Sequence, residues 1–398
     1  MPSIRIECVR DAATLETLNQ NFDCLSGGHA MRRLSWLLPW WNAYQATHLL
    51  HVLVAYRDAK VCGIMPLAET TSPLTGRSLV FMGSGKVCSD DCGILVGPSD
   101  AQDVSEAFAT WIVQSPECCR WDHLNLDGVR ENNFAMECFA TQLQKLTGLQ
   151  VERKQGPNCW SAPLDGGLEA YKNRLSKRVR KIFRDAESAL DSGYGTFEIA
   201  QSKEQALAFA RQIENMHQSR WQERGIEGCF STHEFTGFVD STVARMWQDT
   251  WVEDSIVKDD PPGETPTGKQ RLLVGLLRIN GVVAAGAICF RDRNAVAMYL
   301  VGMNPDCAED RPGWMLNAAF IRYAIEQGCS VFDFLRGDEE YKERLGSFPA
   351  VQHRWMLPSK RWSSQVRNLA YQTAVGLKAW WNVKSAGVPF VGNSPDRV

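Results

Sequence analysis

The hydrophobic and polar positions of the first half of the chain switch repeatedly between a period of two and a period near 3.6. These two periods are typical of half-buried strands and of amphipathic helices. The pattern predicts strands over 3–9, 51–57, 61–69, 77–83, 121–126, 149–155 and 158–164. It predicts helices over 11–20, 31–46, 102–114 and 131–146. The first half therefore alternates helices with groups of strands, which indicates an α/β or α+β class.

The second half has a similar order of elements. Strands are predicted over 196–200, 271–279, 282–290, 295–302, 330–335 and 350–357, and helices over 167–191, 202–223, 232–249, 313–327 and 339–345. Asn280-Gly281 separates two apolar runs, and Asn-Gly in that position favours a tight hairpin. The order strand, two helices, three antiparallel strands, helix, strand, helix, strand occurs in both halves. We interpret this as an internal duplication.

The duplication predicts domains over 1–165 and 166–360, followed by a C-terminal helical tail over 361–398. The tail carries apolar residues at helical spacing, and packing on its own domain or on a partner is favoured over a membrane surface. A stretch rich in Pro, Gly and acids, residues 253–270, is expected to be a surface loop inside the second copy.

Composition excludes several classes of protein. The chain is 44% hydrophobic and 22% charged, which excludes a disordered or fibrous protein, and its net charge of −3 predicts no DNA partner and makes RNA an unfavoured one. The 13 Cys residues are scattered without a CxxC pair, which argues against disulfides, structural zinc or any other metal site. No apolar stretch is long enough for a membrane span, and no signal-like segment precedes the first strand, so we expect a cytoplasmic protein.

Two groups of residues follow predicted strands of the second copy. Arg311, Pro312 and Gly313 stand where a helix begins, and a helix N-terminus can bind a pyrophosphate, although a simple capping turn would have the same pattern. Farther along, Asp338, Glu339, Tyr341 and Lys342 open a short helix after a strand and a turn. The Tyr could donate a proton to a leaving thiolate, and the Lys could neutralise a phosphate or pair with Glu339. An exposed helix start rich in acids is the alternative.

Two further features lie on predicted helices. His217, Arg220, Trp221 and Arg224 share one helix face, where the His could act on an amine substrate, or where the Trp could simply pack while the Arg side chains reach solvent. Residues 171–184 hold seven Lys or Arg and no acid. This run could contact an RNA backbone or the phosphates of a nucleotide cofactor, or could be a solvated helix face.

Taken together, these residues resemble a known family. The strings MHQSRWQERG, YLVGMNP, PGWML, AIEQG and FDFLRGDEEYKERLG, with WLLPWWNAY and LSKRVRKIFR before them, are similar to GNAT-fold acyltransferases of the CelD-like group. That group is associated with cellulose and exopolysaccharide loci. The resemblance implies two tandem GNAT-like domains, each with a mixed, largely antiparallel sheet flanked by helices. It also implies an acyl-CoA donor, acetyl-CoA above all, and an amine or hydroxyl acceptor on a small molecule or saccharide.

The resemblance also implies where the site lies. The stretch 311–315 corresponds to the phosphate-binding loop of the family and keeps a single glycine. The corresponding helix of the first copy, predicted over 102–114, begins with acids, which would repel a pyrophosphate. The working site is therefore expected in the second copy. The cofactor would contact Val301, Gly302, Arg311, Gly313, Trp314 and Lys342. Tyr341 would protonate the leaving thiolate, and His217 or Glu339 would be the general base. The acceptor would contact Trp221, Arg224 and Asp338.

Two other functions compete with this one. A Fem-type transferase, which also has two GNAT-like halves, would take its acyl group from aminoacyl-tRNA and use the basic helix as the RNA contact. A catalytically inactive GNAT pair would serve as a scaffold in polysaccharide synthesis, as the weak phosphate loop could indicate. Retention of RNA at low salt and stabilisation by acetyl-CoA distinguish the three functions.

Overall fold

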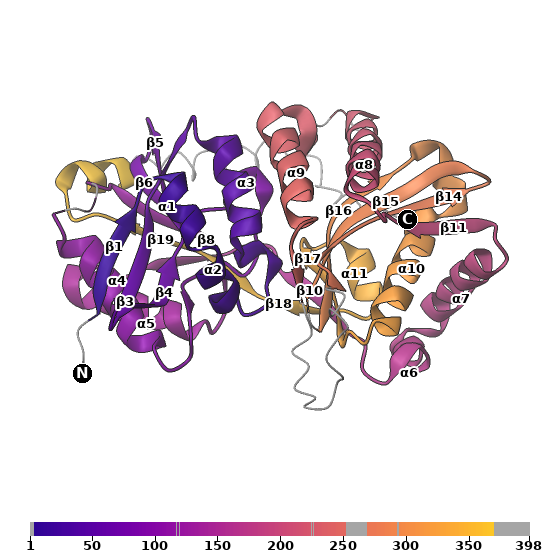
Figure 1. Cartoon of the computed structure of the whole chain (residues 1–398), viewed down its shortest axis with the longest axis horizontal. Helices are drawn as coiled ribbons and strands as arrows, with labels where there is room; N and C mark the ends of the chain where they lie inside the picture. The colour runs from indigo at the N-terminus through magenta and orange to yellow at the C-terminus, as the bar shows by residue number, and fades with distance from the viewer. Residues whose placement is uncertain are drawn as a thin grey trace, which may run out of the picture. The chain divides into compact units, whose positions relative to one another are not determined.

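The computed structural model describes residues 4–369, except 252–268 and the single residues Glu117, Cys119, Arg224, Ile226 and Arg293. Contacts within the chain group these residues into two compact units (Figure 1). Unit 1 comprises residues 4–157 and 351–369, and unit 2 comprises residues 158–350. Each unit has its own hydrophobic core. Among the described residues, no helix is long and apolar enough to cross a membrane.

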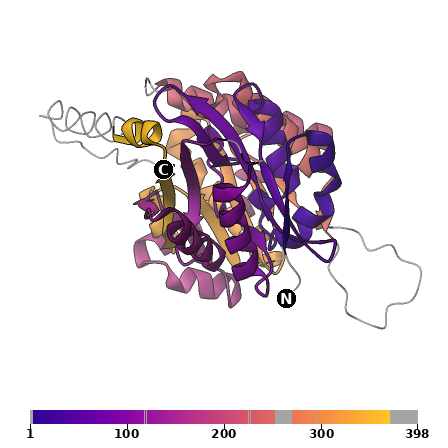
Figure 2. The same cartoon turned by 90° about the vertical axis from the view of Figure 1, so that its left-hand side faces the viewer.

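Unit 1 contains two sheets, with strand orders β1-β3-β4-β7 and β2-β5-β6-β8-β19-β9. Its strands are β1 (Arg5–Val9), β2 (His48–Leu50), β3 (Val52–Arg57), β4 (Lys60–Met65), β5 (Leu67–Ser72), β6 (Gly76–Phe81), β7 (Leu95–Val96), β8 (His123–Arg130), β9 (Glu152–Gln155) and β19 (Gln352–Pro358). Its helices are α1 (Ala12–Thr17), α2 (Asn19–Leu25), α3 (Leu34–Tyr44), α4 (Ala101–Gln114), α5 (Phe134–Thr147) and a last helix over 362–369. The helices α4 and α5 lie side by side (Figure 2).

Unit 2 contains one seven-stranded sheet, with strand order β11-β14-β15-β16-β17-β10-β18, and a separate pair β12-β13. Its strands are β10 (Cys159–Pro163), β11 (Gly195–Ile199), β12 (Thr250–Trp251), β13 (Lys269–Gln270), β14 (Leu272–Ile279), β15 (Val282–Arg291), β16 (Ala295–Met303), β17 (Val331–Arg336) and β18 (Phe348–Ala350). Its helices are α6 (Gly167–Arg174), α7 (Lys177–Asp191), α8 (Lys203–Glu223), α9 (His233–Met246), α10 (Pro312–Glu326) and α11 (Glu340–Arg344). The predicted class of mixed, largely antiparallel sheets flanked by helices is confirmed.

The hairpin between β14 and β15 turns at the predicted residues. Asn280 and Gly281 have φ angles of 50° and 81°, the left-handed region that a two-residue turn of this kind requires and that Asn and Gly adopt at the lowest cost. By contrast, the single helix predicted over 167–191 is divided into α6 and α7. The Ser176 hydroxyl accepts from the Val179 amide and caps α7, which starts a new helix at that point.

The sheet of unit 2 opens between β16 and β17. These strands pair in parallel only over Ala295–Ala297 and Val331–Asp333, and the remainder of β16 up to Met303 pairs with β15 alone among the described strands. Helix α8 lies on one face of this sheet, while α7 and α10 lie on the other. The divergence leaves one backbone edge of β16 open, directly before the turn that leads to α10.

The two units exchange equivalent strands. Strand β10 follows β9 in sequence but inserts between β17 and β18 of unit 2, and β19 follows β18 but inserts between β8 and β9 of unit 1. The structure therefore differs from the boundaries predicted at 165/166 and 360/361, because the units change at 157/158 and 350/351. The hydrophobic pattern locates each strand, but the choice of sheet depends on hydrogen-bond partners distant in sequence. Of the predicted tail, 362–369 is helical, and the remainder lies outside the described residues.

Candidate functional site

A cationic pocket lies at the beginning of α10. It has a volume of about 600 Å³ and is lined by three cations of α7, together with Ile182, Asp185 and Arg311. The three cations are Lys177, Arg178 and Lys181. Arg311 precedes the helix with a φ of 52° and is followed by Pro312 at the first helical position. Four cations around one concave site, beside the positive end of a helix, favour a phosphate-bearing ligand.

The other predicted residues of this loop have mainly structural contacts. Trp314 is buried in the core of unit 2, and its amide donates to the Arg311 carbonyl at 3.0 Å. Gly313 is also buried, and its carbonyl accepts from the Asn317 side chain at 2.7 Å. Of the three residues, Arg311 is therefore the one that lines the pocket with its side chain.

Val301 and Gly302 lie in the part of β16 beyond its pairing with β17. A Cβ atom at Gly302 would lie 2.5 Å from the Ile213 carbonyl oxygen of α8, so this close helix approach requires a glycine. Val301 packs against the core of unit 2. The backbone at these positions, rather than a side chain, is what remains for a ligand at the open edge of β16.

Tyr341 lies in α11 with its ring 6.1 Å from that of Phe334, in an edge-to-face arrangement. Burial raises the pKa of its hydroxyl well above the usual value, the nearby Glu339 charge raises it further, and Arg220 opposes the shift. The hydroxyl is thus protonated throughout the physiological pH range and can donate a hydrogen bond. The influence of Arg220 also shows that α8 presents a cation toward this tyrosine.

Lys342 clamps the turn that joins β17 to α11. Its ammonium donates to the carbonyls of Leu335, Arg336 and Gly337 at 3.2, 2.9 and 3.1 Å, and lies 2.9 Å from the Glu339 carboxylate. The residue is only 2% exposed. These contacts use the donors of the ammonium, so Lys342 has a structural task. Its pairing with Glu339 is the alternative to a phosphate contact that the sequence had left open. The Glu339 carboxylate remains half exposed.

His217 is held by its neighbours in α8 and the following turn. The Trp221 indole donates to Nε2 at 3.0 Å, and the Cys229 sulfur lies 3.9 Å from Nδ1 and 3.8 Å from Nε2. Burial, helped by the Arg220 charge, lowers the pKa of His217 to about 4. The imidazole is therefore neutral near pH 7 and weakly basic. Arg224, predicted beside it, lies outside the described residues.

Asp338 fixes the beginning of β10. Its Oδ1 accepts from the Asn158 amide group at 2.8 Å and from the Trp160 indole at 3.0 Å. Asn158 directly precedes β10 and Trp160 lies within it, so the predicted acceptor contact at Asp338 competes with a structural role. Among the described residues, no group of three or more His, Cys, Asp or Glu could hold a metal ion.

The structure shows which predicted residues act on one another near Tyr341, and it adds the cations of α7 to the predicted residue Arg311. Arg220 acts electrostatically on both His217 and Tyr341, although sequence analysis placed it on the His217 face without assigning it to the site. Glu339 acts on Tyr341 as well. The cations of α7 join Arg311, although the sequence signal, a run of cations without an acid, did not specify that pocket. Cys229 had no sequence signal, because its approach to His217 depends on the turn after α8.

Comparisons with known proteins agree with this geometry. Residues 176–343 match the family model described as acetyltransferase (GNAT) domain. No curated protein matches the sequence. The structure of FemX is similar with a TM-score of 0.57 at 13% identity, covering 87% of this chain and 96% of that one. A conserved protein of unknown function from Bacteroides thetaiotaomicron has a TM-score of 0.53 at 11% identity, with 89% and 100% covered. At these identities the likeness concerns the fold alone. Residues 176–343 are therefore similar to the acetyltransferase (GNAT) domain, and the fold of the chain is similar to that of FemX.

Proposed function

We propose that the chain is an acyl-CoA-dependent N-acyltransferase, which passes an acetyl group from acetyl-CoA directly to an amine, or to a hydroxyl, of a small molecule or saccharide. The observation that carries this proposal is the cationic pocket formed by Lys177, Arg178, Lys181 and Arg311 at the start of α10. The nucleotide end of CoA carries several phosphate charges, and such a pocket favours them. The match of residues 176–343 to the GNAT domain model supports the same donor.

In this mechanism unit 2 acts by positioning and by charge stabilisation. The pocket holds the phosphates, and the backbone near Val301 and Gly302, at the open edge of β16, holds the thioester carbonyl. The acceptor amine attacks the carbonyl carbon and forms the new C–N bond, and the C–S bond then breaks. Tyr341 donates its proton to the departing sulfur, and a general base takes the proton that the amine loses.

Glu339 is the base in this proposal, although His217 was an equal candidate on sequence. The lowered pKa of His217 makes its imidazole a poor proton acceptor, and its Nε2 already accepts from Trp221. Glu339 is half exposed, directly precedes α11 two residues before Tyr341, and influences that hydroxyl electrostatically. His217 then serves to position the α8 face, with Trp221, toward the acceptor.

The kind of acceptor and the cellular role in this proposal rest on the sequence strings that resemble the CelD-like group. They support an amino sugar or another saccharide as the acceptor, a link to exopolysaccharide synthesis and a cytoplasmic location. An inactive scaffold in such a system is the counter-proposal. It would bind no acyl-CoA and release no thiol with any acceptor.

The test is replacement of Tyr341 by Phe, with CoA thiol release measured over a panel of amines and amino sugars. We expect kcat to fall by about 100-fold, with the KM for acetyl-CoA changed less than about twofold, because the hydroxyl acts only on the developing thiolate. Tyr323→Phe in α10 is the matched control, since Tyr323 is a half-buried tyrosine of the same unit. An unchanged kcat in Tyr341→Phe would remove Tyr341 from the mechanism.

A second candidate function is aminoacyl transfer from tRNA, as in a Fem-type enzyme. It is favoured by the cations of α7, which could contact an RNA backbone, and it agrees with the fold likeness to FemX. A tRNA user would retain RNA at low salt and lose it steeply as salt rises. Retention of tRNA together with no binding of acetyl-CoA would favour this second function.

A further inference from the structure

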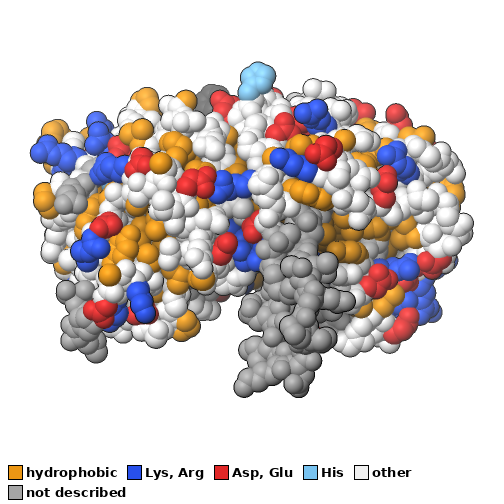
Figure 3. All heavy atoms as spheres, in the orientation of Figure 1, with side chains coloured by type: hydrophobic (Ala, Val, Ile, Leu, Met, Phe, Trp, Pro, Cys, Tyr) orange, Lys and Arg blue, Asp and Glu red, His pale blue; other side chains and the backbone are white. Residues whose placement is uncertain are grey.

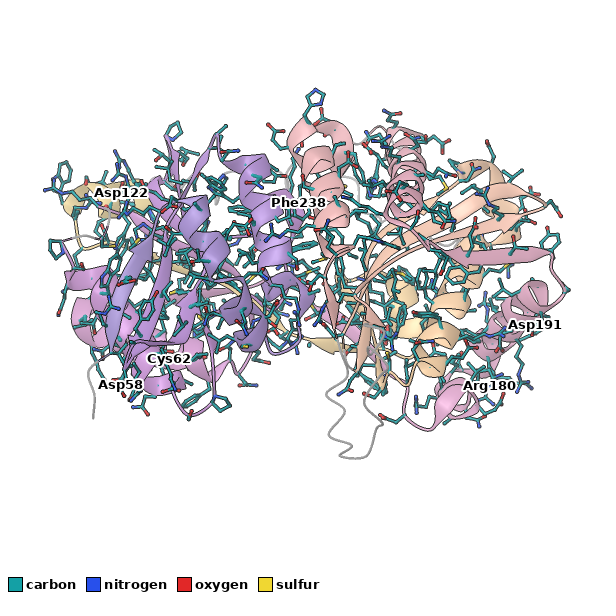
Figure 4. The ribbon with its side chains drawn as sticks, in the orientation of Figure 1. Asp58, Cys62, Asp122, Arg180, Asp191 and Phe238 are labelled. Carbon is teal, nitrogen blue, oxygen red and sulfur yellow. The ribbon has the colours of Figure 1, made fainter. Side chains whose placement is uncertain are left out.

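The last described helix of unit 1, residues 362–369, is attached to its unit through polar side chains. Ser364 donates to Asp122 Oδ1 at 2.6 Å, and Arg367 donates to Asp122 Oδ2 at 3.0 Å. Arg361, just before the helix, donates to Asp122 Oδ1 at 3.1 Å. Asn368 Oδ1 lies 3.2 Å from His123 Nε2. Figure 4 labels Asp122 beside this helix. The polar face of the helix is therefore the face that contacts the protein.

The apolar residues of the same helix are exposed. Trp362, Val366 and Leu369 are 78%, 52% and 70% exposed. Their spacing of four and three residues places them along one side of the helix. A surface helix of a globular protein ordinarily buries its apolar stripe and exposes its polar side. Here the arrangement is reversed, and an apolar stripe held outward by hydrogen bonds indicates an interaction surface.

The charge around this stripe is positive. Lys360, Arg361 and Arg367 flank the apolar residues, and in Figure 3 Lys and Arg side chains gather at the left-hand end of the view, where Figure 1 draws this helix in yellow. From Lys360 to Leu369 the sequence contains no Asp or Glu. An occupant that complements this surface is apolar and negatively charged.

We propose that helix 362–369 binds the surface of an anionic lipid bilayer. Trp362, Val366 and Leu369 would enter the headgroup boundary, and the exposed Lys360 would meet the lipid phosphates. Arg361 and Arg367 contact Asp122, but their side chains remain 42% and 46% exposed and add to the positive charge. A tryptophan is well suited to this boundary, because its ring is apolar and its N–H is polar. The cations Lys360, Arg361 and Arg367 disfavour a second copy of this helix as the occupant, since like charges would face one another. The proposal is independent of the acyl transfer assigned to unit 2.

The test is co-sedimentation of the full chain with vesicles of phosphatidylcholine, with or without one third phosphatidylglycerol. We expect binding to the anionic vesicles to be about tenfold stronger, and to weaken as salt is raised. The triple variant W362Q/V366Q/L369Q should bind neither kind of vesicle. The double variant L49Q/F134Q, which changes two exposed apolar residues of unit 1 in β2 and α5, should bind as the unchanged chain does.

A second variant keeps the test decisive if the triple variant does not fold. Lys360→Gln changes one exposed cation before the helix and should weaken binding to anionic vesicles about fivefold while leaving the melting temperature unchanged. Absence of binding by the unchanged chain, or equal binding to both kinds of vesicle, would overturn the proposal. A concentration-dependent dimer that the triple variant abolishes, without vesicle binding, would assign the stripe to a second copy and would also overturn it.

Discussion

Burial acts on Tyr341 and His217 in opposite directions on the pKa scale, yet leaves both groups neutral near pH 7. It raises the pKa of the Tyr341 hydroxyl and lowers that of the His217 imidazole to about 4, because in each case a low-dielectric surrounding disfavours the charged form. Arg220 adds to the shift of His217 and opposes that of Tyr341. The site therefore offers a hydrogen-bond donor at Tyr341, whereas the neutral His217 already accepts from Trp221.

The lowered pKa of His217 predicts a pH-dependent contribution to stability. The unfolded chain binds a proton at this histidine near pH 6.5, whereas the folded chain binds it near pH 4. The contribution is therefore fully present above pH 6.5 and is lost as the pH falls toward 4, with a slope of at most about 1.4 kcal/mol per pH unit. Urea unfolding of the unchanged chain and of His217→Gln across this range measures it. The two chains should lose stability at different rates there, and parallel curves would contradict the assigned pKa.

Asp122 is a second residue whose pKa differs from its usual value in the folded chain. Burial alone would raise its pKa, but hydrogen bonds from Ser364 and the Arg77 amide, with the charges of Arg361 and Arg367, hold the pKa below the usual value. Stability from this carboxylate is therefore present above about pH 4 and is lost as the pH falls through the lower folded value.

We expect Asp122→Asn to lower the free energy of unfolding by about 2 kcal/mol at neutral pH, since it removes the charge that three side chains share. Urea unfolding monitored by circular dichroism measures the loss. Asp58→Asn is the control, because Asp58 lies in an exposed turn with a φ of 49°, which Asn tolerates. Equal stability of Asp122→Asn and Asp58→Asn would show that the Asp122 contacts contribute little.

Sequence patterns predicted Tyr341 correctly as part of a short helix after a strand, but they did not predict the environment of Lys342. Three carbonyls converge on its ammonium because Leu335 and Gly337 adopt φ angles of 56° and 124° in the preceding turn. Only the glycine signals such a turn in sequence. The sequence predicted a phosphate contact or a pair with Glu339 for this lysine, and the structure has the pair, but the burial of the ammonium depends on the turn geometry.

At the scale of elements, the repeat in the hydrophobic pattern predicted most strands and helices and the number of units, but not the exchange of β10 and β19. Only a few residues connect β9 to β10 and β18 to β19, so the local sequence does not decide which sheet each of these strands joins. The choice follows from cross-strand pairs such as Cys159 with Arg336 and Trp355 with Leu126. These partners are more than 170 residues apart, and a local pattern contains no information about them.

The exchange predicts which fragment of the chain folds. A fragment of residues 158–350 contains every strand of the unit 2 sheet, whereas 166–360 lacks β10 and leaves a gap between β17 and β18. We expect the first fragment to unfold cooperatively and the second to lack a cooperative transition, as measured by thermal melting with circular dichroism. Cooperative melting of 166–360 with the stability of 158–350 would contradict the assigned role of β10.

At the scale of the whole chain, the two units differ at the helix that could hold a phosphate. In unit 1, α4 has Asp100 and Asp103 at its beginning, and both carboxylates lie 3.0 Å from the Arg57 guanidinium. In unit 2, Arg311 precedes α10 and shares a pocket with the cations of α7. Anionic ligands are attracted to the second arrangement and repelled by the carboxylates of the first. The proposed function therefore requires one acyl-CoA site per chain, in unit 2.

Calorimetric titration of acetyl-CoA into the full chain tests this requirement most directly. We predict one site per chain, and a dissociation constant at least about tenfold higher for the double variant K177E/K181E, which reverses two charges of the pocket. The control K60E/K145E makes the same change in net charge on exposed lysines of unit 1 and should bind as the unchanged chain does. Absence of binding to the unchanged chain, or equal affinity in the two double variants, would contradict the central claim that this pocket holds the phosphates of an acyl-CoA donor.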